Sequence, residues 1–81
     1  MTTTQIATDT VQIAIDKLNL FSAVMIAEGE WEMAGVAEED QQPEVAIAAW
    51  QLLVDDGIVW QLQGAFGRQA AAMIEAGLIT T

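Results

Sequence analysis

The segment from Trp60 to Ile79, WQLQGAFGRQAAAMIEAGLI, places the tightest limits on what this chain can fold into. Apolar residues recur through it at intervals of three and four, which is the period of an α-helix with one buried face. Gly77 and the apolar pair that follows it are typical of a helix end. We therefore expect a helix from about Leu62 to Ala76, and its buried face is predicted to be Leu62, Phe66, Ala70, Met73 and Ile74.

The first third of the chain also has a helical period. Apolar residues recur from Val11 onward, and they cover most of the circumference of the helix that they predict. An acceptor side chain at Asp9 or Thr10 suits the start of this helix, which we expect to end near Glu28. The preceding residues 1–9 are rich in threonine and predict a flexible N-terminal tail.

A third helical segment lies between these two. It is expected to start at Pro43, since proline in the first helical position sacrifices no hydrogen bond, and to end at Asp56 before Gly57. Residues 58–60 are β-branched or aromatic, and two interpretations are open for them: a short extended linker, which we favour, or the first turn of the C-terminal helix. Residues 10–79 are therefore predicted to form a single all-α domain, a small three-helix domain with an acidic connection at about 28–42.

The hydrophobic content of the chain indicates self-association. Hydrophobic residues make up 53% of the sequence, above the roughly 45–50% of an ordinary domain. A chain of 81 residues has little interior in which to bury them, and it has no cysteine to form a stabilising disulfide. We therefore expect a homodimer that assembles through apolar helix faces. Gly64, Gly67 and Ala71 would form a strip of small residues that another backbone can approach closely. The expected helix-packing or dimer seam consists of Leu18, Phe21, Met25, Gly64, Gly67, Arg68 and Ala71.

Seven of the twelve acidic residues lie between Glu28 and Glu44. Three interpretations are open for this segment: a solvated loop, which its glycines favour, an acidic surface that faces a partner protein, or a metal or catalytic site. Trp31 has a glutamate on each side and is the best candidate for an exposed anchor, because tryptophan is enriched in the hot spots of interfaces. The candidate partner-binding residues are Glu28, Glu30, Trp31, Glu32, Glu38, Glu39 and Asp40.

The charge of the chain limits the classes of molecule that it can bind. Twelve acidic and two basic residues give a formal net charge of −10, which disfavours direct binding to nucleic acid or to an anionic membrane. The same charge favours a basic partner protein. No apolar stretch is long enough to predict a membrane span, and the N-terminus lacks the basic region of a signal peptide. We therefore expect a cytoplasmic protein.

Catalysis is not expected. The chain has no histidine, cysteine or tyrosine, so the usual pairs of nucleophile and base are absent. The acidic residues do not have the spacing of a calcium-binding EF-hand loop, and we expect neither a cofactor nor a bound metal. Gly64 and Gly67 have the spacing of the loop that holds a nucleic-acid backbone in KH domains, but that loop needs basic neighbours and a supporting sheet. Helix packing is the favoured role of these two glycines.

The C-terminal segment resembles a family of small, uncharacterised proteins encoded by tailed phages, whose motif is W-Q-L-Q-G-x-[FY]-G-R-x-A-x-x-[LM]-I-x-x-G-x-I. The resemblance covers roughly residues 24–79, and residues 35–41 depart from it because the connection in that family is shorter. It implies an accessory gene product of a phage that works in the cytoplasm of an infected bacterial host. The matching positions, most of them taken as structural, are Trp60, Gln61, Leu62, Gln63, Gly64, Gly67, Arg68, Ala70, Ile74 and Gly77.

Two functional hypotheses follow. The first is a small acidic phage protein that binds itself and a basic host or phage protein, and whose sharper form inhibits a host nucleic-acid-handling or defence protein by presenting carboxylates to its basic surface. The alternative is a structural or assembly module that only forms an oligomer and has no host target. Salt dependence separates the two hypotheses, because binding between opposite charges weakens steeply as salt rises.

Overall fold

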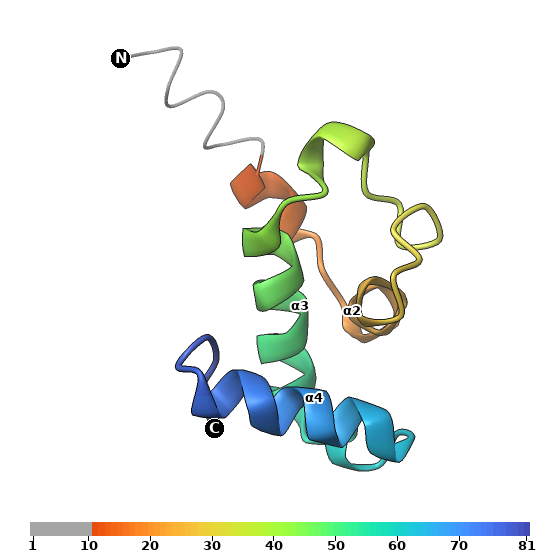
Figure 1. Cartoon of the computed structure of the whole chain (residues 1–81). Helices are drawn as coiled ribbons and strands as arrows, with labels where there is room; N and C mark the ends of the chain where they lie inside the picture. The colour runs from red at the N-terminus through yellow and green to blue at the C-terminus, as the bar shows by residue number, and fades with distance from the viewer. Residues whose placement is uncertain (1–10) are drawn as a thin grey trace.

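A computed structural model describes residues 11–81, so the tail predicted at residues 1–9 lies outside the described part of the chain (Figure 1). Over residues 11–81 the chain contains four α-helices and no strand, and the predicted all-α class is confirmed there. A helix at residues 11–16 is followed by α2 (Leu20–Ala27), the 3₁₀ helix η1 (Glu38–Asp40), α3 (Pro43–Asp56), the 3₁₀ helix η2 (Ile58–Trp60) and α4 (Gly64–Glu75).

The prediction of one helix from residue 11 to residue 28, and with it the count of three helices, is wrong. The chain leaves the helix after Asp16, and α2 starts afresh at Leu20. The side-chain oxygen of Asn19 accepts a hydrogen bond from the backbone N–H of Ser22, and the Ser22 hydroxyl accepts one from the backbone N–H of Asn19, both at 2.9 Å. This reciprocal pair is a capping box, which satisfies two amides at the start of α2 and so stabilises the break.

Helix α3 confirms its prediction at both ends. Pro43 occupies its first turn, and Gly57 follows its last residue with φ of 89° and donates its N–H to the Leu53 carbonyl at 3.1 Å. The extended linker predicted at residues 58–60 is wrong, because these residues form η2, in which the Gln61 N–H reaches the Ile58 carbonyl at 2.9 Å. The expected C-terminal helix is confirmed as α4, and its first turn begins two residues later than predicted.

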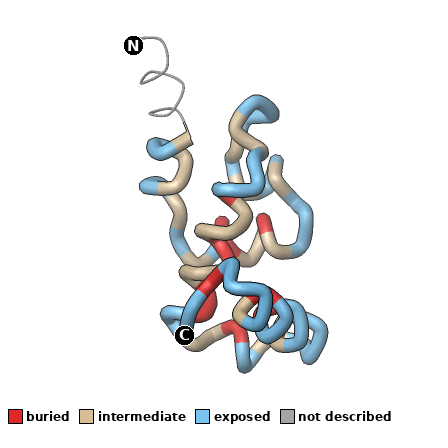
Figure 2. The backbone as a smooth tube through the Cα atoms, turned by 60° about the vertical axis from the view of Figure 1, so that its left-hand side comes forward, coloured by how far each residue is buried: buried red, intermediate tan, exposed pale blue. Residues whose placement is uncertain are grey.

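The hydrophobic core is organised around α3, which contacts α2 and η2, while α4 contacts η2 (Figure 1). Trp50 of α3 and Phe66 of α4 lie with their ring centroids 5.9 Å apart, so the two helices also share aromatic packing. The buried segments gather where these elements meet (Figure 2). The buried apolar residues are Ala23, Ile26, Val45, Ala49, Trp50, Leu53, Val54, Val59, Ala70, Met73 and Ile79.

Several large apolar side chains stay outside this core. Phe21 is 61% exposed, Met33 62%, Ile13 51% and Trp60 50%, whereas Trp50 is 8% exposed. Among the helices described in residues 11–81, none combines the length and the apolar character that crossing a membrane requires.

Candidate functional site

The acidic connection between α2 and α3 consists of turns that backbone hydrogen bonds close. Helix α2 ends at Ala27, and Gly29 follows it with φ of 84°. The N–H of Glu30 then donates to the Met25 carbonyl at 2.8 Å. One further helical turn ends in the same way at Gly35, whose φ is 78°, with the Val36 N–H donating to the Trp31 carbonyl at 3.2 Å. This left-handed helix end favours glycine, which explains both glycines of the segment.

The remainder of the connection is shaped by η1 and by two glutamine side chains. The Nε2 of Gln41 donates to the Val36 carbonyl at 3.4 Å, and the Nε2 of Gln42 donates to the Glu39 carbonyl at 3.0 Å. The predicted acidic connection thus contains a helical turn, a 3₁₀ turn and two glutamine side chains that hydrogen-bond to its backbone. Its carboxylates are carried on hydrogen-bonded turns.

The seven candidate partner-binding residues lie along this connection, and together we call them the acidic surface. Five of them are exposed, whereas the Trp31 and Asp40 side chains are half-buried. Trp31 packs its indole partly against the core, so it is less exposed than an isolated surface anchor would be. The acidic surface comprises Glu28, Glu30, Trp31, Glu32, Glu38, Glu39 and Asp40.

Part of the acidic surface surrounds one hollow of about 560 Å³, which we call the acidic hollow. Glu30, Trp31 and Glu32 line it from the helical turn, and Glu38 lines it from η1. The structure therefore brings these four predicted residues together. It places Asp40 in the lining of a different hollow, and Glu28 and Glu39 outside both linings.

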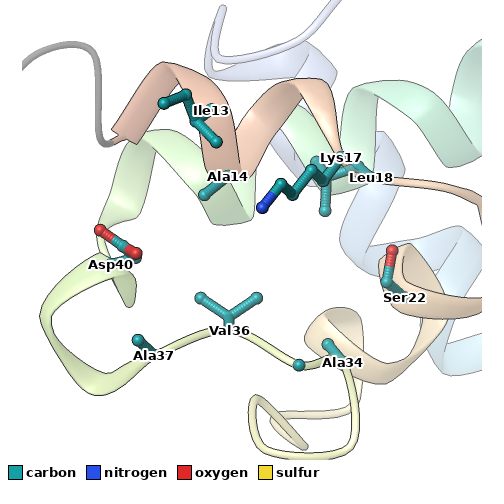
Figure 3. A pocket seen from close by; sticks show the side chains of 10 residues that line it. Ile13, Ala14, Lys17, Leu18, Ser22, Ala34, Val36, Ala37 and Asp40 are labelled. Atoms are coloured by element: carbon teal, nitrogen blue, oxygen red, sulfur yellow. The ribbon is translucent and has the colours of Figure 1, made fainter.

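The second hollow has a volume of about 320 Å³ and lies between the helix at 11–16, the start of α2 and the turn at 34–40 (Figure 3). We call it the apolar hollow. The side chain of Val36 points into it from one side, the amino group of Lys17 enters from the opposite side, and the Asp40 carboxylate lies at its edge (Figure 3). Its apolar wall comprises Ile13, Ala14, Leu18, Ala34, Val36 and Ala37.

Sequence reasoning did not identify Lys17 or Val36 as site residues. Lys17 is the only lysine, and this was a signal that could have marked it. Val36 gave no such signal, because in the sequence it is a single valine near acidic residues. The residues that line the hollow with it come in part from the helix at 11–16. The apolar hollow exists only because two segments about twenty residues apart in sequence face each other.

Three of the seven predicted seam residues lie on α2 or in the break that precedes it. Leu18 falls in the break before α2 and lines the apolar hollow, so it does not continue the face of Phe21 and Met25 as a single helix would require. Phe21 projects from α2 with 61% of its surface exposed, and Met25, one turn further along, is half-buried.

The other four predicted seam residues lie on α4. A Cβ atom added at Gly67 would lie 3.6 Å from the indole of Trp60, so the group over this glycine within residues 11–81 is a tryptophan of the same chain. Gly64, Arg68 and Ala71 are exposed. The Arg68 guanidinium folds back over Gly64, where an added Cβ would meet its Nη1 at 3.1 Å.

The described residues show no arrangement suited to metal chemistry. No group of three or more His, Cys, Asp or Glu side chains among residues 11–81 is placed to hold an ion. In the same part of the chain every buried side-chain nitrogen or oxygen has a hydrogen-bond partner. The described residues instead form two adjoining hollows of different character.

Fold and site together define a small all-α domain with an acidic face. The sequence model of one family, described as a domain of unknown function (DUF7417), matches residues 37–81. This match covers more than half of the chain, and the chain belongs to that family. No curated protein and no solved structure matches the chain. The matched range includes η1, α3, η2 and α4, whereas the opposite wall of the apolar hollow comes from residues that precede it.

Proposed function

We propose that the chain is a binding module that captures a basic protein through its acidic surface and carries out no catalysis. In the fuller form of this proposal it is an accessory protein of a tailed phage, present in the cytoplasm of an infected bacterial host. There it would inhibit a host nucleic-acid-handling or defence protein by presenting carboxylates to a surface that normally binds phosphates.

The observation that carries the proposal is the placement of Glu30, Glu32 and Glu38 around one hollow beside Trp31. Carboxylates imitate phosphates only if their positions are fixed, and here hydrogen-bonded turns hold the backbone that carries them. A net charge of −10 adds long-range attraction to a basic partner and speeds the encounter. These features support recognition of a basic surface better than they support a merely solvated loop.

The experiment compares two variants with equal loss of charge. In the test variant Glu30, Glu32 and Glu38 are changed to glutamine. In the control variant Asp55→Asn, Asp56→Asn and Glu75→Gln remove three charges at the C-terminal ends of α3 and α4, away from the acidic hollow. The full-length tagged chain and both variants are used to capture proteins from bacterial lysate, and each captured protein is then purified and its dissociation constant measured.

We expect the wild-type chain and the control variant to bind the same basic protein, and the test variant to lose it. Binding should weaken steeply between low and high salt, because exposed charges are screened. Equal binding by all three chains, or a partner whose affinity ignores salt, would contradict the proposal.

A second candidate function is self-association, and the exposure of Phe21 favours it. Helix α2 contains no charged residue, and Phe21 and the half-buried Met25 lie one turn apart on it. We propose that this face pairs with a second copy in a homodimer. Sedimentation of the wild-type chain and of Phe21→Ser tests this, since a dimer mass that falls to the monomer mass in the variant is expected. A monomeric wild-type chain at high concentration would exclude it.

A further inference from the structure

The geometry points to a partner segment of defined chemistry: a short peptide that places one apolar side chain in the apolar hollow and a nearby arginine or lysine in the acidic hollow. This inference rests on the proposed function, because it specifies what the acidic surface would bind. It adds a second contact, the apolar hollow, that the proposed function does not need.

The first argument is the shared wall. Val36 and Ala37 line both hollows, so the two hollows adjoin along this stretch of the chain. In a bound peptide, side chains a few residues apart project within about 5–7 Å of one another, on a helix at every third or fourth position and on a strand at every second. One short segment can therefore cross the Val36–Ala37 ridge and occupy both sides.

The second argument is the contrast in charge between the hollows. A cation in the acidic hollow would face the carboxylates of Glu30, Glu32 and Glu38, with the Trp31 ring available for a cation–π contact. A cation in the apolar hollow would meet the Lys17 ammonium, which points inward and offsets the attraction of Asp40 (Figure 3). The positive side chain of the peptide is thus directed to the acidic hollow.

The third argument concerns the occupant of the apolar hollow. Its volume of about 320 Å³ is at the lower end of the range of small-ligand pockets, roughly 300–1,000 Å³. Ile13, Leu18 and Val36 offer aliphatic contact to a side chain that enters. Burial in this hollow stabilises an apolar side chain and leaves the Lys17 ammonium in contact with water. Lys17 therefore acts as the group that fixes the direction in which the peptide lies.

The test uses synthetic serine–glycine peptides that carry one leucine and one arginine at varied spacing, titrated into the full-length ¹⁵N-labelled chain. Control peptides replace the leucine by serine or the arginine by glutamine. We expect the leucine–arginine peptides to shift the amide signals of residues 34–40, and each control peptide to bind at least about tenfold more weakly, as loss of one buried side chain or one charge-assisted contact implies.

Two protein variants address the apolar hollow without touching the acidic one. Ala14→Leu fills the hollow from a helical position that tolerates leucine, and Ile13→Ser removes apolar wall from a side chain that is 51% exposed. Each should weaken binding of the leucine–arginine peptide to the level of the leucine-to-serine control. Lys17→Met should instead strengthen the binding of a peptide with two arginines, since it removes the repulsion in the apolar hollow.

The outcomes separate this inference from the proposed function. If the leucine-to-serine peptide binds as well as the leucine–arginine peptide, or if Ala14→Leu and Ile13→Ser bind normally, the apolar hollow has no part and the inference is wrong, although an acidic binding surface remains. If no peptide shifts the signals of residues 34–40, the inference is equally overturned. If the wild-type chain captures no basic protein in the lysate experiment, or if capture does not depend on the charges of the acidic hollow, the proposed function is overturned as well.

Discussion

The side-chain amide of Gln51 pairs with the backbone of Thr80 through two hydrogen bonds. Its Nε2 donates to the Thr80 carbonyl at 2.7 Å, and its Oε1 accepts from the Thr80 N–H at 2.9 Å. The residue before Thr80 is Ile79, which is 2% exposed and inserts into the core. The last residues of the chain are therefore fixed to the middle of α3 by one buried side chain and one amide pair.

Replacing Gln51 by alanine should release this attachment. We expect the free energy of unfolding to fall by about 1–2 kcal/mol, since two partly exposed hydrogen bonds are lost. Gln12→Ala is the matched control, because Gln12 and Gln51 each donate to an aspartate four residues ahead, at 2.8 Å. The control should cost less than about 0.5 kcal/mol. Urea denaturation followed by circular dichroism measures both, and equal losses would mean that the Thr80 contact contributes nothing.

The capping box at Asn19 should be needed for the start of α2. We expect Asn19→Ala to lower the free energy of unfolding by about 1 kcal/mol, as for other N-cap residues. Ser22→Ala keeps the bond from the residue 22 N–H to the Asn19 side chain and should cost less. Thermal unfolding of the two variants tests this order. A larger loss in Ser22→Ala would indicate that the buried hydroxyl, and not the Asn19 cap, maintains the break.

Gly35→Ala should strain the turn that carries the acidic surface. No atom lies within 4 Å of the Cβ that alanine would add, so the whole penalty comes from φ of 78°. We expect a loss of about 1–2 kcal/mol, and a smaller one for Gly35→Asn, because asparagine tolerates this conformation better. Equilibrium unfolding gives the two values. If the alanine and asparagine variants have the same free energy of unfolding, residue 35 does not need the left-handed conformation.

Gly67→Ala should raise the free energy of unfolding, whereas Gly35→Ala should lower it. Gly67 lies in the second turn of α4 with ordinary helical φ, and the new Cβ would rest 3.6 Å from the Trp60 indole, a normal contact. Helix propensity then predicts a gain of up to about 1 kcal/mol. Sedimentation at several concentrations provides the second readout. A fall in mass would show that another copy packs against this glycine and that alanine obstructs it.

The parts of the fold that the sequence predicts correctly are those whose signals are local. Pro43 and Gly57 mark both ends of α3, and Gly77 lies two residues beyond the end of α4. The break before α2 also had a local signal, since Asn19 and Ser22 have the spacing of a cap. It was missed because the apolar period continues through residues 17–19 and favours an unbroken helix.

The candidate site was only partly predictable. The acidic residues and Trp31 stand out in the sequence, and Glu30, Glu32 and Glu38 do come together. The apolar hollow depends on the packing of α2 against α3, which brings the helix at 11–16 opposite Val36. The hydrophobic periodicity of neither segment predicts that these two segments lie opposite each other. The burial of Ile79, beyond the last helix, is a tertiary contact of the same kind.

The main-chain closure of the turns at Gly29 and Gly35 has a consequence for how such a domain can diversify. The bonds that shape the connection run between backbone groups, with help from the glutamines at its end. The exposed glutamate side chains are not needed for these hydrogen bonds. Descendants of this chain can therefore exchange one glutamate for another residue while the backbone of the connection keeps its conformation.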